Sequence, residues 1–325
     1  MTEPQDYSPE EINDLLRRAE LVQSDMAGVP ADAYRALVSD LWDKGLPAGT
    51  STGWPSLDKH YTVAPGHLTI LTGWPGSGKS EWLDALVLNL ARQGWRIAIH
   101  SPENKPEQIH VVKFLEKFVG KPFGAGLNER MTKAEADEAL TEIAGWFGFL
   151  VAASTAERTV FGMEPILGAA EEWFRSIGAW RSTQNPRGLI IDPWNELEHL
   201  RPKEWSETEY IAATLTGLRS WARTNAVHVW LVAHPQKLRR DDAGKLPVPR
   251  PDSISGSQNW WNKADNAITV WREFDSLMPS RSVEIHIQKI RFKHIGRIGL
   301  VSLDYDRVTG RYSELPGAAL REVGR

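Results

Sequence analysis

One eight-residue segment constrains what this chain can fold into more than any other feature. Residues 73–80 read GWPGSGKS and match the pattern G-x-x-x-x-G-K-[ST] at every fixed position. The apolar run HLTILT precedes the segment and the helical pattern LDALVLNLARQ follows it, which is the strand–turn–helix context that this pattern requires. A chance glycine turn is the alternative. The match predicts a phosphate-binding loop within an α/β fold.

The residue types in this loop suit the binding of a nucleoside triphosphate. Glycine leaves room for backbone N–H groups to close around a phosphate, and the start of a helix adds positive potential. Lys79 is expected to reach the β- and γ-phosphates of ATP, and Ser80 to be a ligand of Mg²⁺. The predicted cofactor-binding loop consists of Gly73, Trp74, Pro75, Gly76, Ser77, Gly78, Lys79 and Ser80.

An acidic residue from another strand is expected near the loop, because nucleotide sites with a phosphate-binding loop hold Mg²⁺ with such a residue. The segment GLIID ends an apolar run in Asp192, which suits this role. The alternative is a solvated aspartate at the end of a strand. We therefore expect Asp192 to be a water-mediated partner of Mg²⁺.

The general base is harder to assign, because Pro193 occupies the position directly after Asp192, where many ATPases with such a phosphate-binding loop have a glutamate. Glu103 follows the strand-like segment WRIAIHS, whose end should lie at the same carboxyl edge of a parallel sheet as the phosphate loop. A carboxylate there can deprotonate an attacking water. Glu196 and Glu198 are rival candidates, and Glu103 alternatively caps the helix that starts near Pro106. We predict Glu103.

Composition excludes several classes of protein. The chain has 325 residues, is 41% hydrophobic and 25% charged, and contains no cysteine, so disulfides, cysteine–zinc sites and thiol catalysis are impossible. No apolar run approaches the roughly 20 residues that cross a bilayer, and the N-terminus has no apolar signal region. We therefore expect a cytoplasmic protein that makes no membrane contact.

Charge is distributed unevenly along the chain, although the net charge is only −4. Residues 1–60 carry 5 Lys/Arg against 11 Asp/Glu, whereas residues 230–300 carry 12 against 7. Any contact with nucleic acid is therefore expected from the C-terminal third.

The patterning predicts three parts. Residues 1–45 have the pattern of polar helices, residues 46–315 alternate strands with helices, and residues 316–325 form a tail. The segment 47–54 is rich in Gly, Ser and Thr, which predicts a linker after the first part. The late strands NAITVWR, SVEIHIQKI and IGLVSLDY follow one another without helices, which predicts antiparallel edge strands. The expected fold is thus a mostly parallel central sheet flanked by helices, with antiparallel edge strands, preceded by short N-terminal helices.

Five stretches, in the family's order, resemble the RecA-like helicase domain of the DnaB- and Twinkle-type ring helicases, and most of all the Twinkle-like phage and prophage primase–helicases. The resemblance covers about residues 40–315, in the segments STGWPSLDKHYTVAPGHLTILTGWPGSGKS, GLIIDPWNELEH, VHVWLVAHPQKLRR, SISGSQNWWNKADNAITVWR and IQKIRFKHIGRIGLVSLDYDRVTGRY. It implies a RecA-like P-loop NTPase that forms a homo-oligomeric, hexameric ring and acts as an ATP-dependent DNA helicase in replication. Only about 45 residues precede it and cysteine is absent, so primase activity is not expected.

The resemblance assigns roles to individual positions. His234 takes the place of the γ-phosphate sensor, and Arg272 and Tyr305 fall where family members sandwich the adenine. Lys289 and Arg291 match a Lys-x-Arg pair that reaches the γ-phosphate of the neighbouring subunit. For four residues the resemblance implies the roles already inferred from the sequence pattern. Lys79 and Ser80 belong to the phosphate loop, Glu103 is the base and Asp192 is the metal-binding acid.

The strand SVEIHIQKIRF supports part of this assignment from its pattern alone. Val283, Ile285 and Ile287 share one face of the strand, and we expect Lys289 and Arg291 to continue the same face. A strand face that is apolar and then carries two cations suggests that the strand leaves the core and that its cations bind an anionic group. A solvated strand end is the alternative, and for His234 the alternative is a structural histidine.

The charged segment 238–257 lies between two strands, and loops of this length inside a compact domain are usually functional or disordered. In the helicases that the chain resembles, these loops line the central channel and contact single-stranded DNA. The candidate DNA-binding residues are Lys237, Arg239, Arg240 and Lys245, with Ser255, Gly256 and Ser257 as further donors. Trp260 and Trp261 could stack on bases, but core packing is favoured.

Two other functions remain open. The first is a RecA-like DNA-binding or regulatory ATPase that assembles but does not unwind DNA. The second, a P-loop kinase, is disfavoured because it leaves Lys289, Arg291 and the basic loop without a role. The N-terminal helices are expected to pack on an adjacent subunit or to recruit a partner, and a separate primase or polymerase is a candidate partner.

Overall fold

The computed structural model describes residues 28–152, 160–182, 184–236, 246–273 and 280–315, and divides the chain into two compact units, 1–48 and 49–325. In the first unit, the described helices are a 3₁₀ turn, η1 (Ala31–Tyr34), and α2 (Arg35–Lys44). Within the described residues no helix is long and apolar enough to span a membrane.

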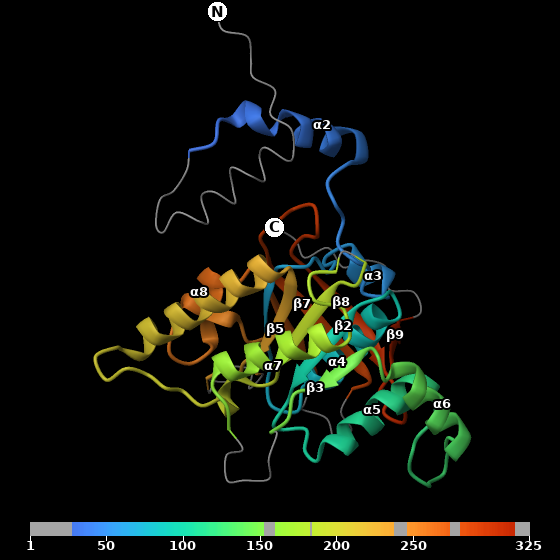
Figure 1. The fold of residues 1–325 in the computed structure, drawn as a ribbon. Helices are drawn as coiled ribbons and strands as arrows, with labels where there is room; N and C mark the ends of the chain where they lie inside the picture. Colours follow the sequence, from blue (N-terminus) through green and yellow to red (C-terminus); the bar gives the residue numbers. More distant parts are fainter. Residues whose placement is uncertain (1–27, 153–159, 183, 237–245, 274–279, 316–325) are drawn as a thin grey trace, which may run out of the picture. The chain divides into compact units, whose positions relative to one another are not determined.

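The second unit is built on a sheet that has nine strands within the described residues. Their order across the sheet is β3-β2-β4-β5-β1-β6-β7-β8-β9. The pairs from β3 to β6 are parallel and the pairs from β6 to β9 are antiparallel, which confirms the predicted mostly parallel sheet with antiparallel edge strands (Figure 1). The strands are β1 (Leu68–Thr72), β2 (Arg96–His100), β3 (Phe147–Phe149), β4 (Arg187–Ile191), β5 (Val227–Val232), β6 (Asn266–Trp271), β7 (Ser282–Ile290), β8 (Gly299–Tyr305) and β9 (Tyr312–Glu314).

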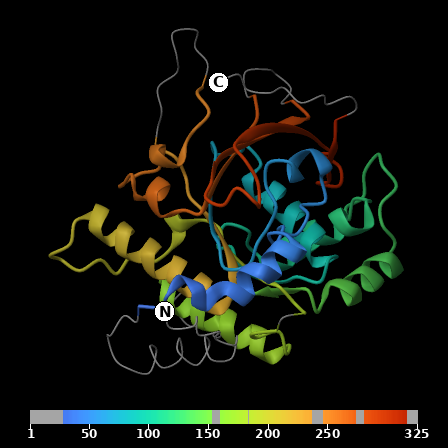
Figure 2. The same cartoon turned by 90° about the horizontal axis from the view of Figure 1, so that it is seen from above.

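Helices cover both faces of this sheet, which explains why its central strands are continuous apolar runs (Figures 1 and 2). Helices α4, α5 and α6 contribute to the core on one face, and α7, α8 and α9 to the core on the other. The helices of this unit are α3 (Pro55–Asp58), α4 (Lys79–Ala91), α5 (Glu107–Val119), α6 (Lys133–Ile143), α7 (Met163–Ser176), η2 (Trp194–Glu196), α8 (Glu207–Asn225), η3 (Pro251–Ser253) and α9 (Asn259–Lys263).

Local sequence explains where two of these helices begin. Thr132 caps α6 by accepting a hydrogen bond from the backbone N–H of Glu135, whose carboxylate accepts one from the backbone N–H of Thr132. Ser206 and Glu209 form the same reciprocal pair at the start of α8. Each pair satisfies backbone donors that the first turn of a helix leaves without partners.

The expected linker over residues 47–54 is wrong for its second half. Thr50 forms a β-bridge with Val63, and Trp54 is buried in the core. The side chain of Asp58 accepts hydrogen bonds from Ser51 Oγ, at 2.5 Å, and from Thr52, so it folds this polar segment back onto α3. The polar residues are therefore partners within the fold rather than a solvated connection.

Buried tryptophans fill the core on both faces of the sheet. Trp82, Trp95, Trp230 and Trp260 are fully buried. Complete burial leaves Trp260 no open face, so base stacking is wrong for this residue and core packing is confirmed. Trp261 lies half-buried against the guanidinium group of Arg250.

Candidate nucleotide-binding site

The phosphate-binding loop follows β1 and leads directly into α4. Gly73, Gly76 and Gly78 all have positive φ angles, which other residues adopt only at a cost. At Gly73 a Cβ atom would lie 2.3 Å from the backbone oxygen of Val270, so only glycine fits. This conformation is the one that points backbone N–H groups inwards around a phosphate.

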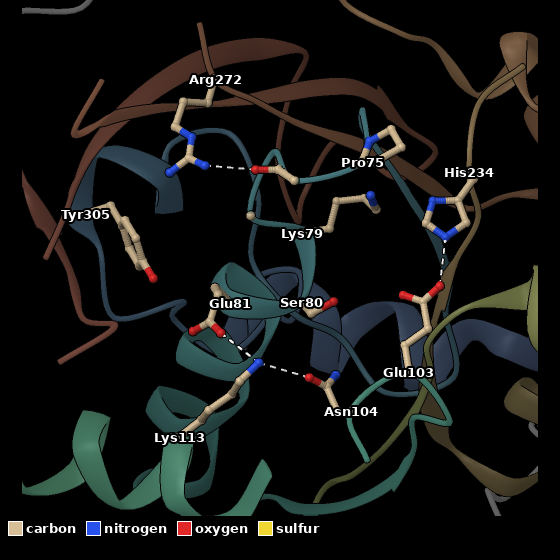
Figure 3. Close-up of a pocket in the computed structure, with 12 residues that line it drawn as sticks. Pro75, Lys79, Ser80, Glu81, Glu103, Asn104, Lys113, His234, Arg272 and Tyr305 are labelled. Atoms are coloured by element: carbon tan, nitrogen blue, oxygen red, sulfur yellow. Dashed lines mark hydrogen bonds and ion pairs between the residues drawn. The ribbon is translucent and has the colours of Figure 1, made fainter. Parts of the chain in front are cut away.

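The loop borders a cavity of about 570 Å³ at the carboxyl edge of the parallel strands. In Figure 3, Arg272 and Tyr305 lie at one end of the cavity and Glu103 and His234 at the other, with Lys79 between them. The structure therefore brings together the segments that follow β1, β2, β5 and β6 with residues of α4, α5 and β8. The lining residues are Pro75, Gly76, Gly78, Lys79, Ser80, Glu81, Glu103, Asn104, Lys113, His234, Arg272 and Tyr305.

Lys79 is held inside the loop by backbone oxygens. Its ammonium group donates to the carbonyl oxygens of Gly73, at 3.0 Å, and of Trp74, at 3.2 Å. Burial lowers the pKa of Lys79, and the negative charges of Asp192 and Glu103 act against this lowering. A buried cation whose hydrogen bonds go only to neutral carbonyls provides a favourable partner for a phosphate.

Asp192 lies directly after β4, and its backbone N–H donates to the carbonyl of His100 at the end of β2. The carboxyl group is buried, and burial raises its pKa to about 6, against the effect of a hydrogen bond with the Ser80 hydroxyl. A buried carboxylate beside a hydroxyl is an oxygen donor pair of the kind that Mg²⁺ prefers, so these two residues fit the ion. In the described part of the chain no cluster of three or more His, Cys, Asp or Glu could hold a metal.

Glu103 lies past the end of β2 and faces the cavity, with its side chain 45% exposed. The Nε2 atom of His234 lies 3.3 Å from its carboxylate, and the backbone N–H of His234 donates to the side chain of Asn195. Neither Glu196 nor Glu198 lines the cavity. The geometry thus favours Glu103 among the three candidate bases. The contact between Glu103 and His234 also links the candidate base to the candidate γ-phosphate sensor.

Near the predicted phosphate position, two polar atoms are buried without hydrogen-bond partners among the described residues, as is Nε of Arg272 at the other end of the cavity. The two atoms are the hydroxyl oxygen of Ser77 in the loop and Nδ1 of His234. Buried polar atoms normally have partners, because leaving one unpaired costs free energy. Both atoms flank the place where a phosphate would bind.

Arg272 and Tyr305 form the other end of the cavity. The guanidinium group of Arg272 donates to the carbonyl of Gly76 at 2.8 Å, so this arginine is fixed to the phosphate loop. Burial raises the pKa of Tyr305 to about 12, so its ring is neutral at physiological pH. An arginine and an aromatic ring suit a planar base, to which both can stack.

Lys289 and Arg291 do not continue the apolar face of β7, which corrects the expectation from the sequence. The pairing of β6 with β7 shifts between Ala267 and Ile268, so that Gln288 is an extra residue on β7. This bulge reverses the alternation. Ile290 therefore packs against the same core as Val283, Ile285 and Ile287, whereas the two cations turn to the opposite face.

The two cations lie at the amino edge of the sheet, a full strand away from the phosphate loop. Lys289 donates to the backbone oxygen of Trp261, and Arg291 Nε pairs with Asp265 at 2.9 Å. Asp265 is fully buried directly before β6, and it also pairs with Arg223. Because β6 is parallel to β1 and has six residues, this position is about 20 Å along the sheet from the edge that carries Lys79. Arg291 cannot reach the phosphates bound by its own chain.

The candidate DNA-binding residues Lys237, Arg239, Arg240 and Lys245 lie outside the described residues. The described residues on either side of them are connected to the nucleotide site. His234 pairs with Glu103, and the indole N–H of Trp74 donates to the carbonyl of Pro247 at 3.0 Å.

The residues proposed as further donors after this segment accept hydrogen bonds from other parts of the protein. The backbone oxygen of Ser255 accepts from Trp260, that of Gly256 accepts from Thr208, and the hydroxyl of Ser257 accepts from Asn259. All three bonds use acceptor atoms of these residues, so their role as donors to DNA stays a prediction.

Sequence reasoning missed three residues of the cavity, which are Glu81, Asn104 and Lys113. Glu81 and Asn104 adjoin the predicted residues Ser80 and Glu103, so adjacency was the available signal. Lys113 lies on α5, outside every motif, and only the packing of α5 beside α4 brings it to the site.

The fold and this site together define a P-loop nucleotide-binding protein of the RecA-like class. Residues 55–240, more than half of the chain, match the family model described as "AAA domain". The chain belongs to this family. Within it, the chain has a RecA-like fold that is similar to DnaB-like helicase domains, and its sequence is similar to a Twinkle homologue.

The chain is 40% identical over 280 residues to the Twinkle homolog protein, chloroplastic/mitochondrial, of Arabidopsis thaliana. The match covers 84% of this chain but 37% of that protein, so the chain spans less than two fifths of its relative's length. Two solved structures share the fold at 17% identity. One is an isolated ATPase domain, with a TM-score of 0.72 over 89% of this chain and 100% of the other. The second is a DnaB-like replicative helicase, with a TM-score of 0.69 over 95% of this chain and 72% of the other.

Proposed function

We propose that this chain is an ATP-dependent DNA helicase that assembles as a ring, a hexamer as its resemblance implies, and moves along single-stranded DNA at replication forks. The observation that carries the proposal is the separation of Arg291 from the phosphate loop of its own chain, by about 20 Å. A second subunit that brings its amino sheet edge to this cavity would complete the site. Hydrolysis would then occur between subunits.

The residues predicted from the sequence have the following roles in the proposed hydrolysis. The backbone of the loop and Lys79 bind the β- and γ-phosphates, Arg272 and Tyr305 hold the adenine, and His234 contacts the γ-phosphate. Glu103 accepts a proton from the attacking water. Ser80 and Asp192 would hold Mg²⁺, which when bound would neutralise negative charge on the phosphates.

The neighbouring subunit is proposed to contribute Lys289 and Arg291. A cation aimed at the γ-phosphate stabilises the charge that develops during phosphoryl transfer. Because Asp265 binds Arg291 through Nε, the terminal nitrogens of the guanidinium group have no partner among the described residues and are available to a phosphate.

Coupling to DNA is proposed to run through the segment that carries Lys237, Arg239, Arg240 and Lys245. Its flanking residues contact Glu103 and Trp74, so movement at the γ-phosphate would be transmitted to both ends of the segment. The ligand is single-stranded or forked DNA. A separate primase or polymerase is the proposed partner, and a role at bacterial or phage replication forks implies action in the cytoplasm.

Strand separation on a forked duplex tests this proposal. With ATP the wild-type protein should release the labelled strand, while Glu103→Gln, which keeps the size of the side chain and removes the base, should not. ATP hydrolysis stimulated by single-stranded DNA without any strand release would instead support the alternative, a DNA-binding or regulatory ATPase that assembles but does not unwind. Absence of hydrolysis by the wild-type assembly would contradict both functions.

A further inference from the structure

Lys113 connects two parts of the nucleotide site that lie on different elements. From α5, its ammonium group pairs with the carboxylate of Glu81 at 2.9 Å and donates to the side-chain oxygen of Asn104, also at 2.9 Å (Figure 3). Glu81 follows Ser80 on α4, and Asn104 follows Glu103 after β2. One side chain thus joins the helix of the phosphate loop to the turn that carries the candidate base.

Apart from this link and the Glu103–His234 pair, the side-chain hydrogen bonds of the turn after β2 stay within the turn, among the described residues. Within it, the Asn104 side chain donates to the Ser101 hydroxyl at 2.8 Å, and its backbone N–H donates to the Ser101 carbonyl at 3.2 Å. These bonds shape the turn but do not fix it relative to α4. The bond from Lys113 to Asn104, together with the ion pair from Lys113 to Glu81, links this turn to α4, the helix of the phosphate loop.

The ion pair with Glu81 does not by itself explain a lysine at this position. Glu81 also pairs with Lys117, which is buried. Burial raises the pKa of Glu81, but the two ammonium groups outweigh this effect and lower it. One buried lysine already supplies a countercharge for the single carboxylate. The second lysine differs from the first in its bond to Asn104 and in lining the cavity.

We propose that Lys113 is a positioning residue for ATP hydrolysis. By holding Asn104, it fixes the distance between the Glu103 carboxylate and the phosphate loop. This inference rests on the proposed function, since it assumes that Glu103 is the base. A displacement of about 1 Å in a reacting group can lower a rate by a factor of about 100, so such a link has a measurable effect.

The test is steady-state ATP hydrolysis by Lys113→Met, in the full chain with single-stranded DNA, with Lys117→Met as the matched control. Both changes remove one ammonium group from Glu81 and keep an unbranched side chain, but only the first breaks the bond to Asn104. We expect Lys113→Met to lower kcat by roughly 10- to 100-fold with KM for ATP changed less than about threefold. Lys117→Met should lower the melting temperature more and kcat less.

A double-mutant cycle with Asn104→Ala shows whether Lys113 acts through this residue. The double variant should be no slower than Lys113→Met alone, because both changes break one link. The inference would be overturned if the fold-losses in kcat of the two single variants multiply in the double variant, or if Lys113→Met leaves kcat unchanged. A rise in KM without a fall in kcat would also overturn it. That result would make Lys113 a direct ligand of the nucleotide.

Glu103→Gln separates failure of this inference from failure of the proposed function. If Glu103→Gln abolishes hydrolysis while Lys113→Met hydrolyses ATP normally, the positioning role is wrong and the base assignment stands. If Glu103→Gln hydrolyses ATP at the wild-type rate, the base assignment itself is wrong. In the Glu103→Gln background, Lys113→Met should cause no further loss.

Discussion

Replacing Asp192 by asparagine should make the nucleotide-free protein more stable at neutral pH. Burial raises the pKa of this carboxyl group from 3.8 to about 6. At about 1.36 kcal/mol per pKa unit, ionisation of Asp192 opposes folding by roughly 3 kcal/mol above pH 6. Asparagine keeps the shape and can still accept a hydrogen bond from Ser80, but it carries no charge.

The sign of the pH dependence follows from the raised pKa. Between about pH 4 and pH 6 the folded protein holds the Asp192 proton while the unfolded chain has released it, so wild-type stability falls as pH rises through this window. The difference in unfolding free energy between Asp192→Asn and the wild type should therefore be near zero at pH 4 and reach about 3 kcal/mol at pH 8. Urea denaturation at a series of pH values measures it.

A matched control and a ligand complete this experiment. Glu103→Gln changes a carboxylate that is 45% exposed, and should alter stability by no more than about 0.5 kcal/mol. Adding Mg²⁺ with a non-hydrolysable ATP analogue should stabilise the wild type more than Asp192→Asn, because the bound ion compensates the buried charge. An Asp192→Asn protein that is less stable than the wild type at pH 8, or a difference that does not vary with pH, would refute the reasoning.

Three further predictions concern ATP hydrolysis and DNA binding. Lys79→Ala should abolish ATP hydrolysis and weaken binding of a fluorescent ATP analogue without lowering the melting temperature; normal turnover would exclude the phosphate-loop assignment. Glu103→Gln should keep ATP binding while turnover falls by roughly 10²- to 10⁴-fold; if Glu196→Gln is inactive instead, the base is Glu196. When alanine replaces Lys237, Arg239, Arg240 and Lys245 together, the salt slope of single-stranded DNA binding should fall by up to about 0.7 per phosphate contact removed. An unchanged slope would locate the DNA path elsewhere.

The sequence was sufficient for the parts of the site that depend on local pattern and on strand direction. The glycine spacing of the phosphate loop is a local property, and Gly73 proves to lie where no Cβ atom fits. Glu103 and Asp192 follow from a topological rule, because loops after parallel strands meet at one edge of the sheet. The buried strands were equally clear, since helices cover both faces.

The features that sequence reasoning missed depend on packing between distant elements. The extra residue Gln288 turns Lys289 and Arg291 to the other face of β7, and a bulge of this kind leaves no mark in an alternating pattern. Lys113 reaches the cavity only because α5 packs beside α4. The polar segment after residue 49 looked like a linker because its hydrogen-bond partner, Asp58, lies on α3.

The central claim is that the site is shared between subunits, and mixing two inactive variants tests it most directly. Arg291→Ala keeps an intact phosphate loop, and Lys79→Ala keeps an intact Arg291. Each variant alone should hydrolyse ATP very poorly, since an arginine supplied in trans is worth roughly 10³- to 10⁵-fold in rate.

In an equal mixture about one interface in four should combine both intact parts, if subunits exchange at random in a ring of head-to-tail contacts. We predict that ATP hydrolysis reappears at up to that fraction of the wild-type rate, and that it disappears on dilution below the assembly concentration. Full turnover by Arg291→Ala alone would contradict the shared site, as would a mixture that stays inactive although mass measurement shows mixed assemblies.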